Sequence, residues 1–88
     1  MKVLKPASAG TMESSDAYVE VTPAEELTVS IESVVAKQFG DKIDAAVRDV
    51  LSELSVKTAS VKVIDRGALE CVIRARVETA LMRSGGDK

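Results

Sequence analysis

The fold of this chain is decided by residues 41–54, which read DKIDAAVRDVLSEL. Apolar side chains recur there at spacings of three and four, and charged side chains take the opposite side, which is the pattern of an amphipathic helix. Asp41 follows Gly40, and its carboxylate can accept hydrogen bonds from the N–H groups of a first helical turn. We therefore expect a helix that begins at Asp41 and buries Ile43, Ala46, Val47, Val50, Leu51 and Leu54.

The sequence before this helix indicates two strands. Tyr18–Thr22 is rich in strand-forming residues and stops at Pro23. Residues 27–32 alternate between apolar and polar side chains, as a half-buried strand does. This second strand can run on through Val34 and Val35, where the alternation slips. We expect the two strands to pair as a hairpin.

The sequence after the helix indicates a third strand and a second helix. Alternation returns over Val56–Asp65, which predicts the strand. Asp65-Arg66-Gly67 offers a second cap, and a helical pattern then runs to a stop at Gly85-Gly86. Its apolar face consists of Leu69, Val72, Ile73, Val77, Ala80 and Leu81.

The element order, strand-strand-helix-strand-helix, predicts a small two-layer α+β domain. Two amphipathic helices on one face of a three-stranded sheet form the smallest arrangement that buries every apolar stripe. The other sheet face would be more polar, and the pattern leaves the strand order open. We expect a flexible arm over residues 1–17, the α+β domain over residues 18–84 and a disordered tail over residues 85–88.

Composition argues against several classes of function. The chain has 88 residues, enough for one domain, with a net charge of -2 and only two aromatic residues, so nucleic-acid binding is disfavoured. It has no histidine, which removes the commonest general base and metal ligand. The N-terminus has no apolar run of signal-peptide length, and no stretch is long enough to span a bilayer. We expect a cytoplasmic protein without membrane contacts.

Few side chains in the predicted domain suggest a chemical role. Cys71 borders the second apolar face, and a lone cysteine there is more often a small buried hydrophobe than a nucleophile. The carboxylates are spread over solvent faces, so we predict no metal. Four arginines, at positions 66, 74, 76 and 83, invite a basic-patch interpretation. A solvated helix face with Glu70 and Arg74 paired is favoured by the spacing.

The segment Ala9–Asp16 is not needed by the fold. It holds three hydroxyls, two carboxylates and a glycine, without the pattern of a phosphate-binding loop or a hydrolase nucleophile elbow. One interpretation is an ordinary loose terminus. The other is that a serine is displayed for covalent modification, since a core-free segment tolerates a bulky adduct.

Three blocks of sequence together resemble the acyl carrier protein, or gamma chain, of citrate lyase. They are Ala9–Asp16, Lys37–Asp41 and Asp65–Arg76, and the resemblance covers nearly the whole chain in the same order. In the family motif the modified residue is the serine directly after the glutamate, which is Ser14 here. Ser15 occupies a position where the motif also accepts glycine.

This resemblance implies a non-catalytic carrier subunit in citrate fermentation. The implied group is 2'-(5''-phosphoribosyl)-3'-dephospho-CoA, joined to Ser14 through a phosphodiester by a prosthetic-group transferase. Its thiol would carry acetyl and citryl thioesters, so Cys71 is not implicated. The implied partners are an alpha chain, which exchanges acetyl for citrate, and a beta chain, which cleaves the citryl thioester to oxaloacetate.

Other functions stay open at this point. The carrier of malonate decarboxylase or of citramalate lyase would use a related group on a related serine. In a different class, the chain would be an unmodified protein-interaction adaptor that binds through a sheet edge or its arginine-bearing helix. A hydrolase with Ser14 as nucleophile is remote, because no base is evident.

Overall fold

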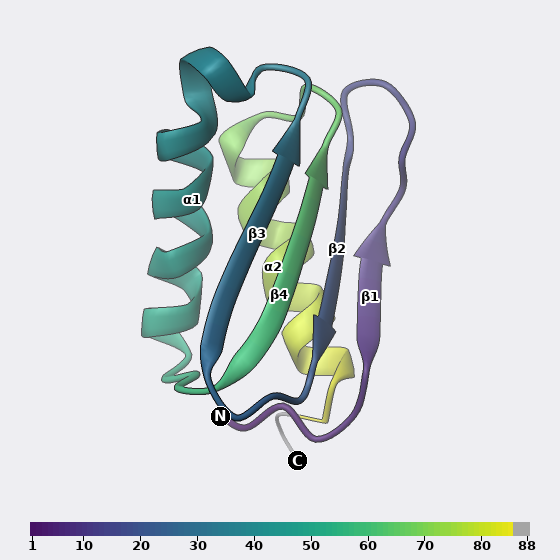
Figure 1. Ribbon diagram of the computed structural model, residues 1–88. Helices are drawn as coiled ribbons and strands as arrows, with labels where there is room; N and C mark the ends of the chain where they lie inside the picture. Colours follow the sequence, from purple (N-terminus) through teal and green to yellow (C-terminus); the bar gives the residue numbers. More distant parts are fainter. Residues whose placement is uncertain (86–88) are drawn as a thin grey trace.

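The computed structural model describes residues 1–85 and contains a four-stranded sheet with two helices on one face (Figure 1). This confirms the two-layer α+β class, with one strand more than predicted. Most of the predicted tail lies outside the described residues. The elements are β1 (Ala7–Gly10), β2 (Ala17–Thr22), β3 (Leu27–Ser33), α1 (Ala36–Glu53), β4 (Ala59–Asp65) and α2 (Glu70–Arg83).

The strand order is β1-β2-β4-β3, so the predicted hairpin of β2 and β3 is wrong. β4 lies between them, antiparallel to β2 and parallel to β3. The parallel pairing arises because α1 carries the chain back along the sheet before β4 begins. β4 is better suited than β3 to a position between two strands. Ala59, Val61 and Val63 are at most 1% exposed, whereas the apolar residues of β3 are only half-buried.

The additional strand, β1, lies in the segment that the sequence indicated to be an irregular arm. Ala7–Gly10 pairs with β2 in antiparallel register, from Ala7 opposite Val21 to Gly10 opposite Tyr18. Its small residues give little strand signal, but at a sheet edge Ala9 becomes buried and β1 contacts α2. The irregular assignment is therefore wrong for Ala7–Gly10.

The core lies between the sheet and the helices, as the alternation predicted. Residues 19, 21, 61 and 63 are buried valines on the inner face, whereas Glu20 and Lys62 are exposed on the outer face. The predicted α1 face is also confirmed, with Leu54 half-buried at its end.

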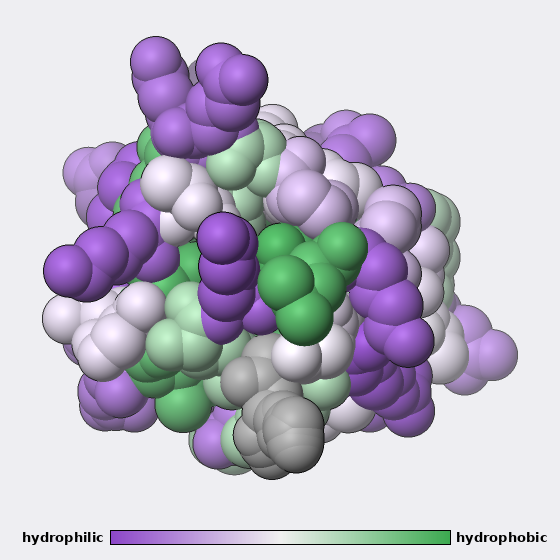
Figure 2. Space-filling view, turned by 90° about the horizontal axis from the view of Figure 1, so that it is seen from below, coloured by the Kyte–Doolittle hydropathy of each residue, from purple (hydrophilic) through white to green (hydrophobic). Residues whose placement is uncertain are grey.

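The end of the molecule with both termini is largely hydrophilic, with a small apolar cluster near its centre (Figure 2). No helix within residues 1–85 is long and apolar enough to cross a membrane.

Both helix starts differ from the prediction. α1 begins at Ala36, so Gly40 and Asp41 lie inside the helix and Asp41 is not its cap. Residues 37–39 are compatible with a helix, and Gly40 can adopt the helical conformation at a modest cost in stability. α2 begins at Glu70, and Leu69, predicted to be in the core, is 71% exposed at its N-cap.

The side chain of Asp65 connects the start regions of the two helices. This carboxylate is 1% exposed and accepts hydrogen bonds from the N–H groups of Gly67 (3.2 Å) and Ala68 (2.8 Å). It also accepts the Ser33 hydroxyl at 2.8 Å. The Ser33 oxygen in turn accepts the N–H of Val35 at 3.0 Å, directly before α1. The predicted capping role of Asp65 therefore exists, but in the turn before α2.

Asp65→Ala should lower the free energy of unfolding by about 2 to 4 kcal/mol, because the Ser33 hydroxyl and the N–H groups of Gly67 and Ala68 all lose their acceptor. Chemical denaturation measures the difference. Asp41→Ala is the matched control: it should change stability by less than about 0.5 kcal/mol, whereas loss of a helix cap would cost about 1 kcal/mol. A larger loss in Asp41→Ala than in Asp65→Ala would contradict this assignment.

Candidate functional site

Ser14 lies in the connection between β1 and β2, at the end of the molecule opposite to the termini (Figure 1). The N–H of Asp16 donates to the carbonyl of Glu13 at 3.1 Å, which closes a β-turn with Ser14 and Ser15 at its central positions. Ser15 has a φ of 68°, a left-handed value that glycine adopts most readily. This explains why glycine would be accepted at that position. Ser14 is exposed.

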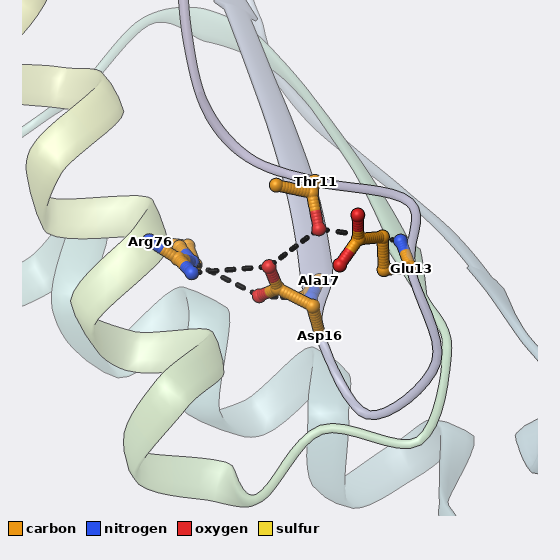
Figure 3. A network of polar contacts seen from close by, with 5 residues as sticks. All are labelled: Thr11, Glu13, Asp16, Ala17 and Arg76. Carbon is orange, nitrogen blue, oxygen red and sulfur yellow. Dashed lines mark hydrogen bonds and ion pairs between the residues drawn. The ribbon is translucent and has the colours of Figure 1, made fainter.

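The carboxylate of Asp16 organises this connection, as Figure 3 shows. The Arg76 guanidinium on α2 donates to both of its oxygens, each at 3.0 Å. The Thr11 hydroxyl donates to the same carboxylate at 2.6 Å and accepts the N–H of Glu13 at 3.2 Å. The Asp16 side chain is only 16% exposed. These contacts fold residues 11–16 against α2.

Hydrogen bonds to the charged form keep Asp16 ionised. The Thr11 hydroxyl, the Arg76 guanidinium and the Ala17 N–H lower the pKa of the Asp16 carboxyl from 3.8 to about 2. The connection thus keeps its central charge at every pH at which the protein would work.

The backbone supplies a second attachment for the same connection. The N–H of Ser15 donates to the Arg66 carbonyl at 2.8 Å, and the N–H of Arg66 donates to the Asp16 carbonyl at 2.9 Å. These bonds extend the β2–β4 ladder beyond the ends of both strands. The residues after Ser14 are therefore fixed, and within residues 1–85 the Ser14 hydroxyl itself has no hydrogen-bond partner.

Gly10 permits the chain to enter the connection from β1. Its φ is 93°, and a Cβ there would lie 1.9 Å from the carbonyl oxygen of Ala17 and 3.1 Å from the Arg76 side chain. A side chain at this position would push against both β2 and the ion pair. Glycine is required for the approach of the two strands.

Three of the four arginines, at positions 74, 76 and 83, contact carboxylates or backbone rather than form an open basic patch, whereas Arg66 is exposed. Arg74 pairs with Glu70 as predicted, and also with Asp49 of α1, each at 3.0 Å. The Arg83 guanidinium donates to the Ser8 carbonyl at 3.0 Å. Arg76 is the arginine with a role at the site, and no local pattern could predict this contact because Asp16 lies 60 residues away.

Cys71 is exposed, so its prediction as a small buried hydrophobe is wrong. It lies two positions before the buried Ile73, which turns it about 200° away around the helix.

The residues at the Ser14 turn fit a covalent serine adduct, because the hydroxyl is exposed and no packed side chain has to move. Within the described part of the chain, no group of three metal-ligating side chains exists.

The Asp16 contacts predict a pH dependence of stability. Because the pKa falls on folding, the stabilisation is complete above about pH 4 and is lost as the pH falls towards 2. The difference in Tm between the wild type and Asp16→Asn should therefore be constant from pH 7 to 5 and shrink towards pH 2. Asp44→Asn, which loses an exposed pair with Arg48, should stay close to the wild type in Tm at neutral pH. A pH-independent effect of Asp16→Asn would contradict the ion-pair account.

Known proteins agree with the resemblance found in the sequence. A family model described as "Malonate decarboxylase delta subunit (MdcD)" matches residues 4–84. A citrate lyase acyl carrier protein of Haemophilus influenzae (strain PittEE) is 55% identical over 84 residues, which cover 96% of this chain and 88% of the relative. A citrate lyase acyl carrier protein of Pectobacterium atrosepticum is 53% identical over 85 residues, with the same coverage.

The fold also has a solved counterpart. A chain in the crystal structure of a Pseudomonas malonate decarboxylase hetero-tetramer in complex with malonate aligns with a TM-score of 0.83, covering 94% of this chain and 87% of that one. At 19% identity this likeness concerns the fold alone. The family model and the two relatives show that the chain belongs to the family of the citrate lyase acyl carrier proteins and the malonate decarboxylase delta subunit.

Proposed function

We propose that this chain is the acyl carrier subunit of citrate lyase and that Ser14 carries its prosthetic group. The Ser14 turn is the observation that carries the proposal. An exposed hydroxyl at the apex of a turn is accessible to a modifying enzyme, and the Asp16–Arg76 pair with the Arg66 backbone fixes its position. The relatives that bear this name, with 55% and 53% identity, support citrate lyase as the complex.

The hydrogen bonds of the connection distinguish the Thr11 hydroxyl from those of Ser14 and Ser15. The Thr11 hydroxyl is engaged by Asp16 and by the N–H of Glu13, so a modification there would remove contacts that order the loop. Ser14 and Ser15 are both exposed, and Ser15 is held by its backbone at a positive φ. The choice of Ser14 over Ser15 rests on the family motif, in which the modified serine directly follows the glutamate.

The proposed group is 2'-(5''-phosphoribosyl)-3'-dephospho-CoA, linked through a phosphodiester to the Ser14 oxygen. When bound, it supplies a thiol that carries acyl groups as thioesters. The chain's own residues present the attachment point and hold the turn. They include no histidine, which fits a subunit that transports the acyl group and leaves catalysis to others.

The proposed partners are the alpha chain, which transfers the acyl group, the beta chain, which cleaves the citryl thioester, and the prosthetic-group transferase, all in the cytoplasm. A covalent tether makes the encounter of the acyl group with each partner site intramolecular, which raises its effective concentration. A fixed attachment point at one end of the molecule lets both partners approach the same face.

A second candidate is the carrier of malonate decarboxylase, which the family model favours. The Ser14 turn would serve that function equally well. It would also suit the carrier of a citramalate lyase. The subunits that co-purify with the native chain distinguish these complexes. An unmodified adaptor would leave the Ser14 turn without a role.

Intact-mass spectrometry of the chain purified from its own host, grown on citrate, should show the mass of the group on the wild type. Ser14→Ala should abolish the added mass, because the acceptor oxygen is gone, whereas the control Ser15→Ala should retain it. Loss of the mass only in Ser15→Ala would move the site by one residue. A homogeneous unmodified wild type would refute the carrier function.

A further inference from the structure

A groove lies between the N-terminal parts of α1 and α2. It has a volume of about 230 Å³, and its apolar walls include Phe39 and Ile43 from α1 and Leu69 and Ile73 from α2 or its N-cap. Ile43 and Ile73 are buried at its base, at 6% and 2% exposure. The groove is therefore an apolar recess backed by the core.

The rim of the groove leaves large apolar side chains in water. Leu69 is 71% exposed and Phe39 is 43% exposed. Exposed apolar side chains gathered around a recess are a mark of a binding site, because each loses part of the favourable free energy of burial. Lys42 covers the Phe39 ring at 5.8 Å, and Glu70 is engaged by Arg74.

The groove is held to the Ser14 turn through the connection between β4 and α2. Ala68 and Leu69 of this connection form one wall of the groove. Two residues earlier, the backbone of Arg66 bonds to Ser15 and Asp16. The turn and both helix starts lie at the same end of the molecule (Figure 1). A group attached to Ser14 therefore begins close to the groove.

We propose that this groove receives the thiol-bearing, pantetheine part of the group carried on Ser14, an inference that rests on the proposed function. This part of the arm is a narrow chain whose pair of methyl groups suits a small apolar recess, while its two amides can stay at the open side, beside Lys42 and Glu70 of the lining. The charged phosphates are better solvated outside it. A short flexible tether gives an effective concentration on the order of millimolar, so even weak affinity suffices for substantial occupancy. The alternative occupant is an apolar side chain of a partner subunit.

Methyl NMR of the labelled chain, with and without the group and with loading verified by intact mass, tests the proposal. The methyl signals of Ile43, Ile73 and Leu69 should shift on loading, whereas those of Leu27 and Val56, near the opposite end, should not. Leu69→Ser should return the Ile43 and Ile73 signals towards their unloaded positions. Leu4→Ser, which replaces a leucine that is 63% exposed near the C-terminal end of α2, is the matched control and should leave them shifted.

The outcomes separate the two proposals. Shifts confined to residues 11–16 in a fully loaded chain would overturn the groove assignment and leave Ser14 as the carrier residue. Groove shifts that appear only after addition of the alpha chain would assign the groove to a partner and also overturn it. A chain without added mass would refute the proposed function and, with it, this inference.

Discussion

The buried carboxylate of Asp65, at the end of β4, is the constraint on which the functional end of the molecule depends. It joins the end of β3 through Ser33 to the turn before α2 through Gly67 and Ala68. Because it is almost fully buried, its contacts cannot be replaced by water without a large cost. Both helices therefore start from a position that one residue fixes.

The position of the Ser14 turn depends on the residues around Asp65. Arg66, the next residue, extends the β2–β4 ladder to Ser15 and Asp16, and α2 then carries Arg76 to the Asp16 carboxylate. The bidentate geometry of this pair fixes direction as well as distance. A serine can thus sit at the apex of an exposed turn without that turn being loose. The same connection carries Leu69 to the groove, so the attachment point and the groove are joined through a few residues of backbone.

The sequence allowed the class of fold to be predicted, because burial follows local periodicity. Val61 and Val63 alternate with polar residues, and Ile43, Val47 and Val50 recur at helical spacing. It did not allow the order of the strands to be predicted. Whether β4 lies between β2 and β3 depends on pairing between segments that are far apart in the sequence. β1 was missed because Ala7 and Ala9 have little strand propensity of their own and form a strand only by pairing with the free edge of β2. The Asp16–Arg76 pair spans 60 residues and leaves no local pattern, whereas Ser14 was found by its family motif.

The Ser14 turn is held in place by the Arg76 side chain and by the backbone of Arg66. Amide hydrogen exchange of Ser15 tests it most directly, because that N–H bonds to the Arg66 carbonyl outside any regular element. Protection at Ser15 should be clear in the wild type and fall about tenfold or more in Arg76→Ala, a change of about 1.4 kcal/mol or more in the free energy of opening. Protection of Val19 and Val63 should persist, as should that of Ser15 in the control Arg74→Ala. An unprotected Ser15 in the wild type, or equal protection in Arg76→Ala, would contradict the claim.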